Sequence, residues 1–290
     1  MTALSTPLGL REQLIASHDT PLSGGPTVLD APTWPWSSDR AEPKRLLDAV
    51  IVSDIHLGAD NCEAKPLANL LEAILAGDIA TRSLIINGDV FDSIDFRRLR
   101  KTHWKILSLI RHLSDKIEVV WIAGNHDGSA DIISHLLGVD VVNEYLLVSG
   151  GRKMLILHGH QFDDFIDDHP VLTWLADGIY WALQQIDRTH YVARLAKRRS
   201  KIFVHAVEKI ERGALALAKQ RGCQAVICGH THHSAARESG PVHYYNSGCW
   251  TERPSAYLTV CNGVVELILD RDAKEEAAVA EPAVATAQAG

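Results

Sequence analysis

The stretch LLDAVIVSDIHLG, residues 46–58, decides the fold of this chain. Its short apolar run is closed by polar residues, which predicts a buried strand. The run leads directly into Asp54 and His56, two positions apart. In an extended segment such positions point to the same side about 7 Å apart, so both side chains can converge on one site.

Strand and helix patterns alternate after this stretch. SLIINGD (83–89) and IEVVWIAGN (117–125) are two further short apolar runs. Helical spacing follows the three runs near residues 65–76, 98–113 and 129–137. This β-α-β rhythm is typical of a sheet wrapped by helices.

The rhythm then changes to antiparallel strands. YLLVSGGRKMLILHG predicts a hairpin around Gly150-Gly151, and AYLTVCNGVVELIL predicts a second one around Asn262-Gly263. A long, mostly helical stretch over about 161–222 separates them. We therefore expect an α/β fold with two packed sheets and a helical insertion.

Both ends of the chain differ in composition from the middle. Residues 1–45 are rich in Pro, Ser, Thr and Gly, which predicts a poorly ordered arm. Residues 271–290 form an Ala/Glu-rich tail that cannot bury enough apolar area to fold alone. The working domain is therefore expected at 46–270, with the insertion at about 161–222 as a lid.

The composition is that of a water-soluble protein. In 290 residues, 46% are hydrophobic and the formal net charge is −7, which argues against nucleic-acid binding by bulk electrostatics. Five cysteines without CxxC spacing suggest neither a disulfide framework nor a thiolate zinc site. No secretory signal or run of 18 apolar residues is present, so we expect a cytoplasmic protein, with any membrane contact peripheral and at the inner face.

Metal-ligand residue types follow five predicted strands. After Asp54 and His56, the next four strand ends carry ligand types as well: Asp89 and Asp92, Asn125 and His126, His158 and His160, and CGHTHH (228–233) with His230, His232 and His233. The carboxyl ends of strands in α/β sheets gather ligands at one edge. A single DxH or HxH pair is more often a hydrogen-bonded loop, whereas five in succession favour a shared site.

The ligand types indicate the kind of metal. Mixed carboxylate, amide and imidazole ligands suit borderline divalent ions, and the number of ligands exceeds the need of one ion. Two ions about 3.5–4 Å apart, bridged by a shared carboxylate, would use them. We expect manganese first, with iron or zinc as alternatives.

SDIHLG, NGDVFD, GNHD, LHGH and CGHTHH, in this order, resemble the signature blocks of the calcineurin-like metallophosphoesterases. The resemblance spans about 50–260. It implies a four-layer α/β/β/α sandwich and a dinuclear metal centre that hydrolyses phosphoester or pyrophosphate bonds. A hydroxide shared by the two ions would attack phosphorus in line.

The resemblance also implies a role for each matching position. The first metal would be held by Asp54, His56 and His232, and the second by Asn125, His158 and His230, with Asp89 between them. His126 would contact the substrate phosphate and protonate the leaving oxygen, and the Asp92 carboxylate would orient its imidazole. His160 and His233 are expected to contact substrate or support the ligands.

A bacterial branch of the family is more similar still. LHGHQFDDF, the insertion and YYNSGCWTE resemble the enzymes related to UDP-2,3-diacylglucosamine pyrophosphatase of the lipid A pathway, although their best-studied subgroup has Arg where this chain has His126. The resemblance implies a diacylated lipid-nucleotide substrate. Asn246, Cys249 and Trp250 are expected to line the rim of the site.

The insertion carries two features that fit such a substrate. Residues 188–212 hold eight basic residues against two acidic ones, and Arg194, Arg198, Lys201 and His205 share one helix face. This face would meet substrate phosphates or an anionic membrane surface, or it is simply solvated. VLTWLADGIYWALQQI (171–186) is apolar around most of its circumference, which fits core packing or an acyl-binding lid.

Two alternatives stay open at this point. One is a phosphodiesterase or phosphatase that acts on soluble nucleotides or phosphoproteins. The other is a binding scaffold that keeps the fold without catalysis, although no ligand position of the motifs is missing. Oligomeric state is not indicated by the sequence.

Overall fold

The structure is a computed structural model that describes residues 45–128, 130–163, 201–238 and 240–270. The expected arm, the expected tail and most of the expected lid (164–200) lie outside the described residues. All five strand ends with metal-ligand residues lie inside them.

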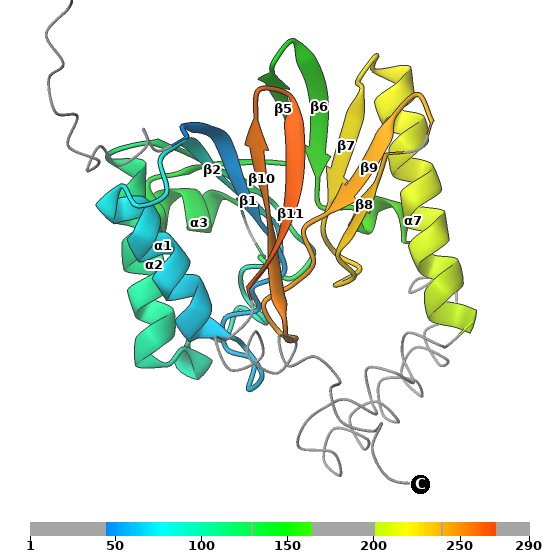
Figure 1. The fold of residues 1–290 in the computed structure, drawn as a ribbon. Helices are drawn as coiled ribbons and strands as arrows, with labels where there is room; N and C mark the ends of the chain where they lie inside the picture. Colours follow the sequence, from blue (N-terminus) through cyan, green and yellow to red (C-terminus); the bar gives the residue numbers. More distant parts are fainter. Residues whose placement is uncertain (1–44, 129, 164–200, 239, 271–290) are drawn as a thin grey trace, which may run out of the picture. The chain divides into compact units, whose positions relative to one another are not determined.

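The first sheet contains the strand that opened the sequence. It has six strands in the order β11-β10-β1-β2-β3-β4 (Figure 1). Their bounds are β1 Leu47–Val52, β2 Thr81–Asn87, β3 Glu118–Ile122, β4 Asp140–Val142, β10 Ser255–Cys261 and β11 Val264–Asp270. β1 to β4 run parallel, as expected for β-α-β units, whereas β10 is antiparallel to β1.

The second sheet has five strands in the order β5-β6-β7-β9-β8. Their bounds are β5 Glu144–Ser149, β6 Arg152–Leu157, β7 Ala225–Cys228, β8 Ala235–Arg237 and β9 His243–Asn246. β6, β7 and β9 are parallel to one another. Both sheets therefore contain parallel strands whose carboxyl ends can carry a site.

The described α-helices are α1 Ala64–Ala76, α2 Lys101–Ser114, α3 Ala130–Leu137 and α7 Lys201–Gln220. The helix expected near 98–113 begins later than predicted. Asp95 instead caps a short 3-10 helix, η1 (Phe96–Arg98), and Leu99 and Arg100 are extended before α2 starts. None of the described helices is both long and apolar enough to cross a membrane.

Three apolar cores separate four layers, which confirms the expected α/β/β/α fold. One core lies between the first sheet and α1, α2 and α3, with Trp121 fully buried. A second lies between the two sheets, and a third lies between the second sheet and α7. Alternate residues of β1 face different cores: Val50 and Val52 face the helices, and Ala49 and Ile51 face the other sheet.

Both predicted hairpins are present. β5 and β6 join through Gly150-Gly151, and β10 and β11 join through Asn262-Gly263, with positive φ at all four turn residues, as a type I′ turn requires. A Cβ on Gly150 would lie 2.4 Å from the Asn262 carbonyl carbon, so the turns are in close contact. Asp48 of β1 ties them together: its carboxylate accepts hydrogen bonds from Ser149 Oγ (2.5 Å) and the Asn262 N–H (2.8 Å).

Candidate metal centre

The loops after β1, β2, β3, β6 and β7 meet at one place, as the sequence predicts. Backbone hydrogen bonds tie them together: the Asp54 N–H donates to the Gly88 carbonyl, and the Gly229 N–H donates to the His158 carbonyl, both at 3.0 Å. Between the sheets, the His230 N–H donates to Asp54 Oδ1 (3.0 Å), so both sheets contribute to a single site.

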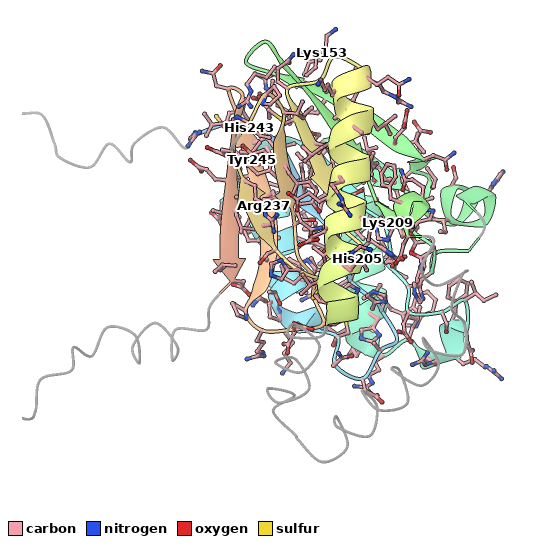
Figure 2. All side chains as sticks on the ribbon, turned by 90° about the vertical axis from the view of Figure 1, so that its right-hand side faces the viewer. Lys153, His205, Lys209, Arg237, His243 and Tyr245 are labelled. Carbon is pink, nitrogen blue, oxygen red and sulfur yellow. The ribbon has the colours of Figure 1, made fainter. Side chains whose placement is uncertain are left out.

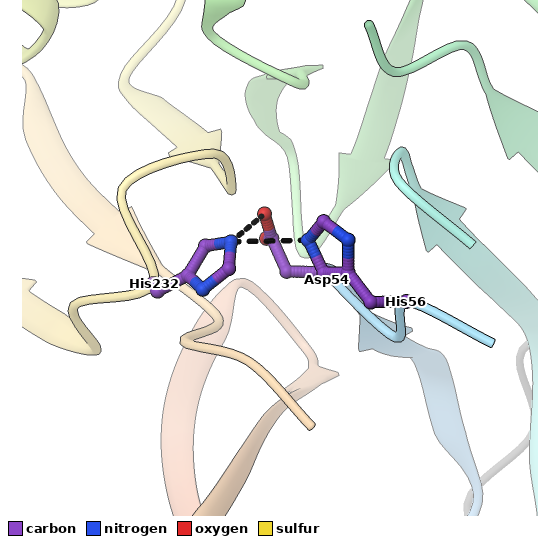
Figure 3. A group of neighbouring side chains, drawn as sticks. All are labelled: Asp54, His56 and His232. Carbon is purple, nitrogen blue, oxygen red and sulfur yellow. Dashed lines mark hydrogen bonds and ion pairs between the residues drawn. The ribbon is translucent and has the colours of Figure 1, made fainter. Parts of the chain in front are cut away.

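The first ligand group contains Asp54, His56 and His232, whose ligand atoms all lie within 4.8 Å of one another. His56 Nε2 lies 3.1 Å from His232 Nε2, and His232 Nε2 lies 3.4 Å from Asp54 Oδ1 (Figure 3). Three potential ligand atoms thus converge on one point from two loops.

The second ligand group contains Asp89, His158 and His230, with the same 4.8 Å limit between their ligand atoms. Asp89 Oδ2 lies 3.2 Å from His158 Nε2 and 3.9 Å from His56 Nε2. Asp89 therefore lies between the two groups. His230 and His232 fall into different groups, as the resemblance of CGHTHH to the family motif implies.

Two further observations indicate that these residues are suited to bind metal ions. His158 Nε2 is buried and makes no hydrogen bond among the described residues, while its Nδ1 lies 2.8 Å from the Asn87 carbonyl and so carries the proton. Glycines also make room for the ligands. A Cβ on Gly88 would lie 2.3 Å from His158 Nδ1, and a Cβ on Gly124 would lie 2.2 Å from Asp89 Oδ1. Oxygen and imidazole donors of this kind suit borderline divalent ions.

The backbone at the ligand positions is unusual. Among the described residues, the non-glycine residues with positive φ are Asn262 of a hairpin turn and five members of the two groups: Asp54, His56, Asp89, His230 and His232. L-residues adopt the left-handed region at a cost of about 1–3 kcal/mol each, and such residues cluster at functional sites. The loops are therefore strained where the ligands lie.

Burial and close charges shift the pKa values of the ligands. Burial raises the pKa of Asp54 to about 6 and lowers that of His56 to about 4. At His158 burial alone would lower the pKa, but the carboxylates of Asp89 and Asp54 outweigh it and raise it to about 9. At Asp89 burial alone would raise the pKa, but the contact with His158 outweighs burial, so the pKa of Asp89 is lowered. A cation that binds here would therefore displace a proton from His158.

Asp127, the last residue of GNHD, has a structural role that the sequence analysis did not assign. Its buried carboxylate accepts hydrogen bonds from five donors: the backbone N–H groups of Asp89, Val90, Phe91 and Gly124, and Trp121 Nε1. It thereby fixes the loop after β2 against the loop after β3. Its position next to the candidate site residues is the only sequence signal for this role.

The sequence analysis expects Asn246, Cys249 and Trp250 at the rim of the site. This expectation is wrong, because all three residues are buried. The Asn246 side-chain amide donates to the Gly229 carbonyl (2.8 Å) and to Thr231 Oγ1 (3.1 Å). Asn246 therefore stabilises the conformation of the CGHTHH loop through two hydrogen bonds.

His126 lies beside the first group, with its ring centroid 5.2 Å from that of His56. Its side chain is exposed, and its backbone N–H donates to Asp89 Oδ1 at 2.9 Å. The expected partner Asp92 does contact His126 Nδ1, but through its backbone carbonyl (3.1 Å) and not its carboxylate. The carboxylate instead accepts a hydrogen bond from the Arg98 guanidinium at 2.5 Å, a charge-assisted ion pair.

The remaining predicted site residues lie at different distances from the two ligand groups. Asn125 lies in the exposed loop next to His126. The ring of His160 is centred 5.5 Å from that of His158, beside the second group. The His233 N–H donates to Thr231 Oγ1 within the CGHTHH loop, and His233 belongs to neither group.

The predicted basic face is only partly described. Arg194 and Arg198 lie outside the described residues, and of Lys201 only the backbone, at the start of α7, is described. His205 is exposed on α7, the helix that covers the second sheet (Figure 2). Neither ligand group includes a residue of α7. Contact of this face with substrate therefore stays a prediction.

The fold and the paired His/Asp groups define the class: the protein is a metal-dependent hydrolase with its site at the strand ends of two packed sheets. The family model of the calcineurin-like phosphoesterases matches residues 48–234, more than half of the chain. The chain belongs to this family, whose members normally bind two divalent metals. The match does not assign it to a branch of the family.

The chain is also similar, at low sequence identity, to several solved structures. They include an archaeal phosphodiesterase, with 14% identity over 76% of this chain and 98% of that chain and a TM-score of 0.42. They also include Yfce, a phosphoesterase from E. coli, with 13% identity, 77% and 99% coverage and a TM-score of 0.39. A hypothetical protein, PH1004 from Pyrococcus horikoshii, has 9% identity, 81% and 92% coverage and a TM-score of 0.44. No curated protein sequence matches the chain.

Proposed function

We propose that this protein hydrolyses phosphoester or phosphoanhydride bonds with two divalent metal ions, Mn²⁺ first. The observation that carries the proposal is the position of Asp89 between two groups of ligand atoms, 3.2 Å from His158 Nε2 and 3.9 Å from His56 Nε2. A carboxylate in this position is suited to bridge two ions. When bound, such ions activate a water molecule for in-line attack and neutralise the charge of the phosphate.

The side chains would divide the binding of the ions between them. Asp54, His56 and His232 would hold the first ion, and His158 and His230 the second. Asn125 would add an amide oxygen to the second group, next to the N–H that His126 donates to Asp89. Asp89 would contact both ions.

His126 would transfer the proton to the leaving oxygen. Its Nδ1 lies 3.1 Å from the Asp92 carbonyl, which only accepts hydrogen bonds, so Nδ1 carries a proton. As an imidazolium, the ring would then present a second proton on Nε2. The exposed side chain beside the first group is open to a substrate.

The substrate is a finer part of the proposal. The resemblance of LHGHQFDDF and YYNSGCWTE to the UDP-2,3-diacylglucosamine pyrophosphatase branch makes a diacylated lipid nucleotide the first substrate to test. On this hypothesis the basic segment 188–212 would contact phosphates or an anionic membrane surface. The alternative substrates are soluble nucleotides, other diesters and phosphoproteins.

One parallel assay tests the class and the substrate together. Metal-free protein is loaded with Mn²⁺ and given a UDP-linked diacylglucosamine, a chromogenic phosphodiester and a chromogenic phosphomonoester. We expect turnover of at least one substrate, dependent on Mn²⁺. Turnover of the diester with an untouched lipid nucleotide would exclude the lipid A substrate. No turnover of any substrate with both ions bound would indicate a scaffold and refute the proposed hydrolase function.

A further inference from the structure

Asp163 is a carboxylate at the edge of the second ligand group that neither group contains. It directly follows η2 (His160–Phe162), the 3-10 turn after β6. Its Oδ2 lies 3.0 Å from His230 Nε2, and the two side chains are only 14% and 11% exposed. A carboxylate can only accept a hydrogen bond, so His230 donates from Nε2. The lone pair of a neutral His230 ring is then on Nδ1.

The position of Asp163 is fixed by the packing of η2. Phe162 lies against α7 where Gly213 leaves space, since a Cβ on Gly213 would lie 2.6 Å from Phe162 Cδ1. Within the turn, the Phe162 N–H donates to the Gly159 carbonyl (3.1 Å) and the Asp163 N–H to the His160 carbonyl (3.0 Å). Asp163 is thus held by the η2 turn, which packs against α7 through Phe162.

The other histidines of the two groups use their nitrogens the opposite way. Nδ1 of His158 points away from the group to the Asn87 carbonyl, and Nδ1 of His232 lies 3.4 Å from Thr251 Oγ1. Nδ1 of His56 lies 3.8 Å from the Asp92 carboxylate. In these three rings Nε2 is the atom that faces the ligand groups. In His230 it is Nε2 that is bonded to a partner outside the group.

We propose that Asp163 is a positioning residue for the second metal ion: it holds His230 in the Nε2–H tautomer and presents Nδ1 as the ligand atom. The inference rests on the proposed function, because it assumes that the second group binds a metal. A carboxylate on the distal nitrogen of a ligating histidine fixes the ring and increases its basicity, and its loss typically weakens metal binding 10–100-fold.

The test is a Mn²⁺ titration of the full-length, metal-free chain by calorimetry. Asp163→Ala is expected to weaken the second Mn²⁺ site about 10–100-fold and leave the first unchanged. Asp163→Asn keeps an oxygen that accepts the Nε2–H and should recover part of the affinity. Asp115→Ala, which removes an exposed carboxylate of a surface ion pair, is the matched control and should bind both ions as the wild type does.

A second variant moves Asp163 without removing a charge. In Gly213→Ala the added methyl group would displace Phe162, while alanine has a higher helix propensity than glycine. The second site should weaken although α7 is not destabilised, which circular dichroism of the metal-free variant would verify. This variant separates the position of the carboxylate from general stability.

The tautomer is read directly from nitrogen chemical shifts. In the Zn²⁺-loaded protein labelled with ¹⁵N-histidine, His230 should show a protonated Nε2 and a metal-bound Nδ1. A metal-bound Nε2, or wild-type affinity of the second site in Asp163→Ala, would overturn the inference and leave the proposed function intact. A wild-type chain that binds no Mn²⁺ would instead overturn the proposed function.

Discussion

At the scale of single residues, Asp89 connects several parts of the site through its contacts. Its carboxylate contacts His158, faces His56 and accepts the His126 N–H, while its own N–H donates to Asp127. Removal of this one side chain should therefore affect both ligand groups at once.

We expect Asp89→Ala to lose its metal ions, because no other carboxylate among the candidate ligands lies between the two groups. Mass spectrometry of the purified protein should show a fall from about two ions per chain to less than one. Asp60→Ala, which removes an exposed carboxylate paired with Arg100, should keep the wild-type metal content. Full metal occupancy in the Asp89 variant would contradict the bridging role.

His126→Ala should separate catalysis from metal binding. The variant is expected to keep both ions, because the backbone N–H that contacts Asp89 is unchanged. Turnover should fall by about 10²–10⁴-fold if the ring acts as general acid. His112→Ala on the exposed face of α2 is the control. Unchanged turnover, measured in steady-state assays with metal content verified, would remove His126 from the mechanism.

The ligand residues could be predicted from their spacing, but their partners could not. The sequence brings Asp92 near His126 through GDxxD, yet nothing in it shows that the Asp92 carboxylate would pair with Arg98 and leave its carbonyl to the imidazole. Asp163 was equally hidden, because it contacts His230, 67 residues along the chain. Contacts of this kind depend on the packing of loops and not on local pattern.

At the scale of elements, Asp48 links three parts of the fold. It lies on β1 and accepts hydrogen bonds from the turn of the β5–β6 hairpin and from the turn of the β10–β11 hairpin. β1 and β10 belong to the first sheet and β5 to the second. One carboxylate therefore ties the two sheets together at the end of the hairpin turns.

Asp48→Ala should lower the free energy of unfolding by about 1–3 kcal/mol, because it leaves the buried Ser149 hydroxyl without its charged acceptor. The hydrogen bond from Ser149 lowers the pKa of Asp48 below its usual 3.8 in the folded state. Its contribution is then present above pH 3.8 and is lost as the pH falls through the lower, folded-state pKa. Urea unfolding at pH 7 should show the difference, with less of it near pH 3; an effect that grew in acid would contradict this account.

Helix and hairpin positions were largely predictable, and the error at α2 has a local cause. Both turns have the glycine or Asn-Gly sequence that a type I′ turn needs, so their positions followed from the sequence. The start of α2 did not, because Asp95 caps the short helix η1 and the His103 ring accepts the Arg100 N–H to open a new one. Residue spacing alone does not show which of two neighbouring capping residues begins the longer helix.

At the scale of the whole molecule, metal binding should stabilise the fold, since the two groups draw ligands from both sheets. A ligand at 100 times its dissociation constant adds about 2.7 kcal/mol to the stability of the state that binds it. Chelation should therefore lower the unfolding midpoint measured by calorimetry, and Mn²⁺ should restore it. The control is chelated protein to which Ca²⁺ is added in place of Mn²⁺, in magnesium-free buffer. An identical midpoint with and without Mn²⁺ would argue against a site shared between the sheets.

The strand ends that form the site were predictable, and the assembly of two sheets explains why the rest was not. The sequence indicates five loops at the ends of strands, but β1, β2 and β3 belong to one sheet and β6 and β7 to the other. Which loops face each other follows from the core between the sheets, where Ile51, Ile156 and Ile227 pack.

The left-handed ligand positions set a limit on how this protein can change over evolution or in the laboratory. Asp54, His56, Asp89, His230 and His232 all hold a backbone conformation that glycine adopts without cost. Replacement of such a ligand by glycine would relieve strain while it abolishes metal binding. Selection for the thermal stability of the metal-free protein would thus drift toward an inactive fold, whereas bound metal ions would oppose this drift because they stabilise the native state.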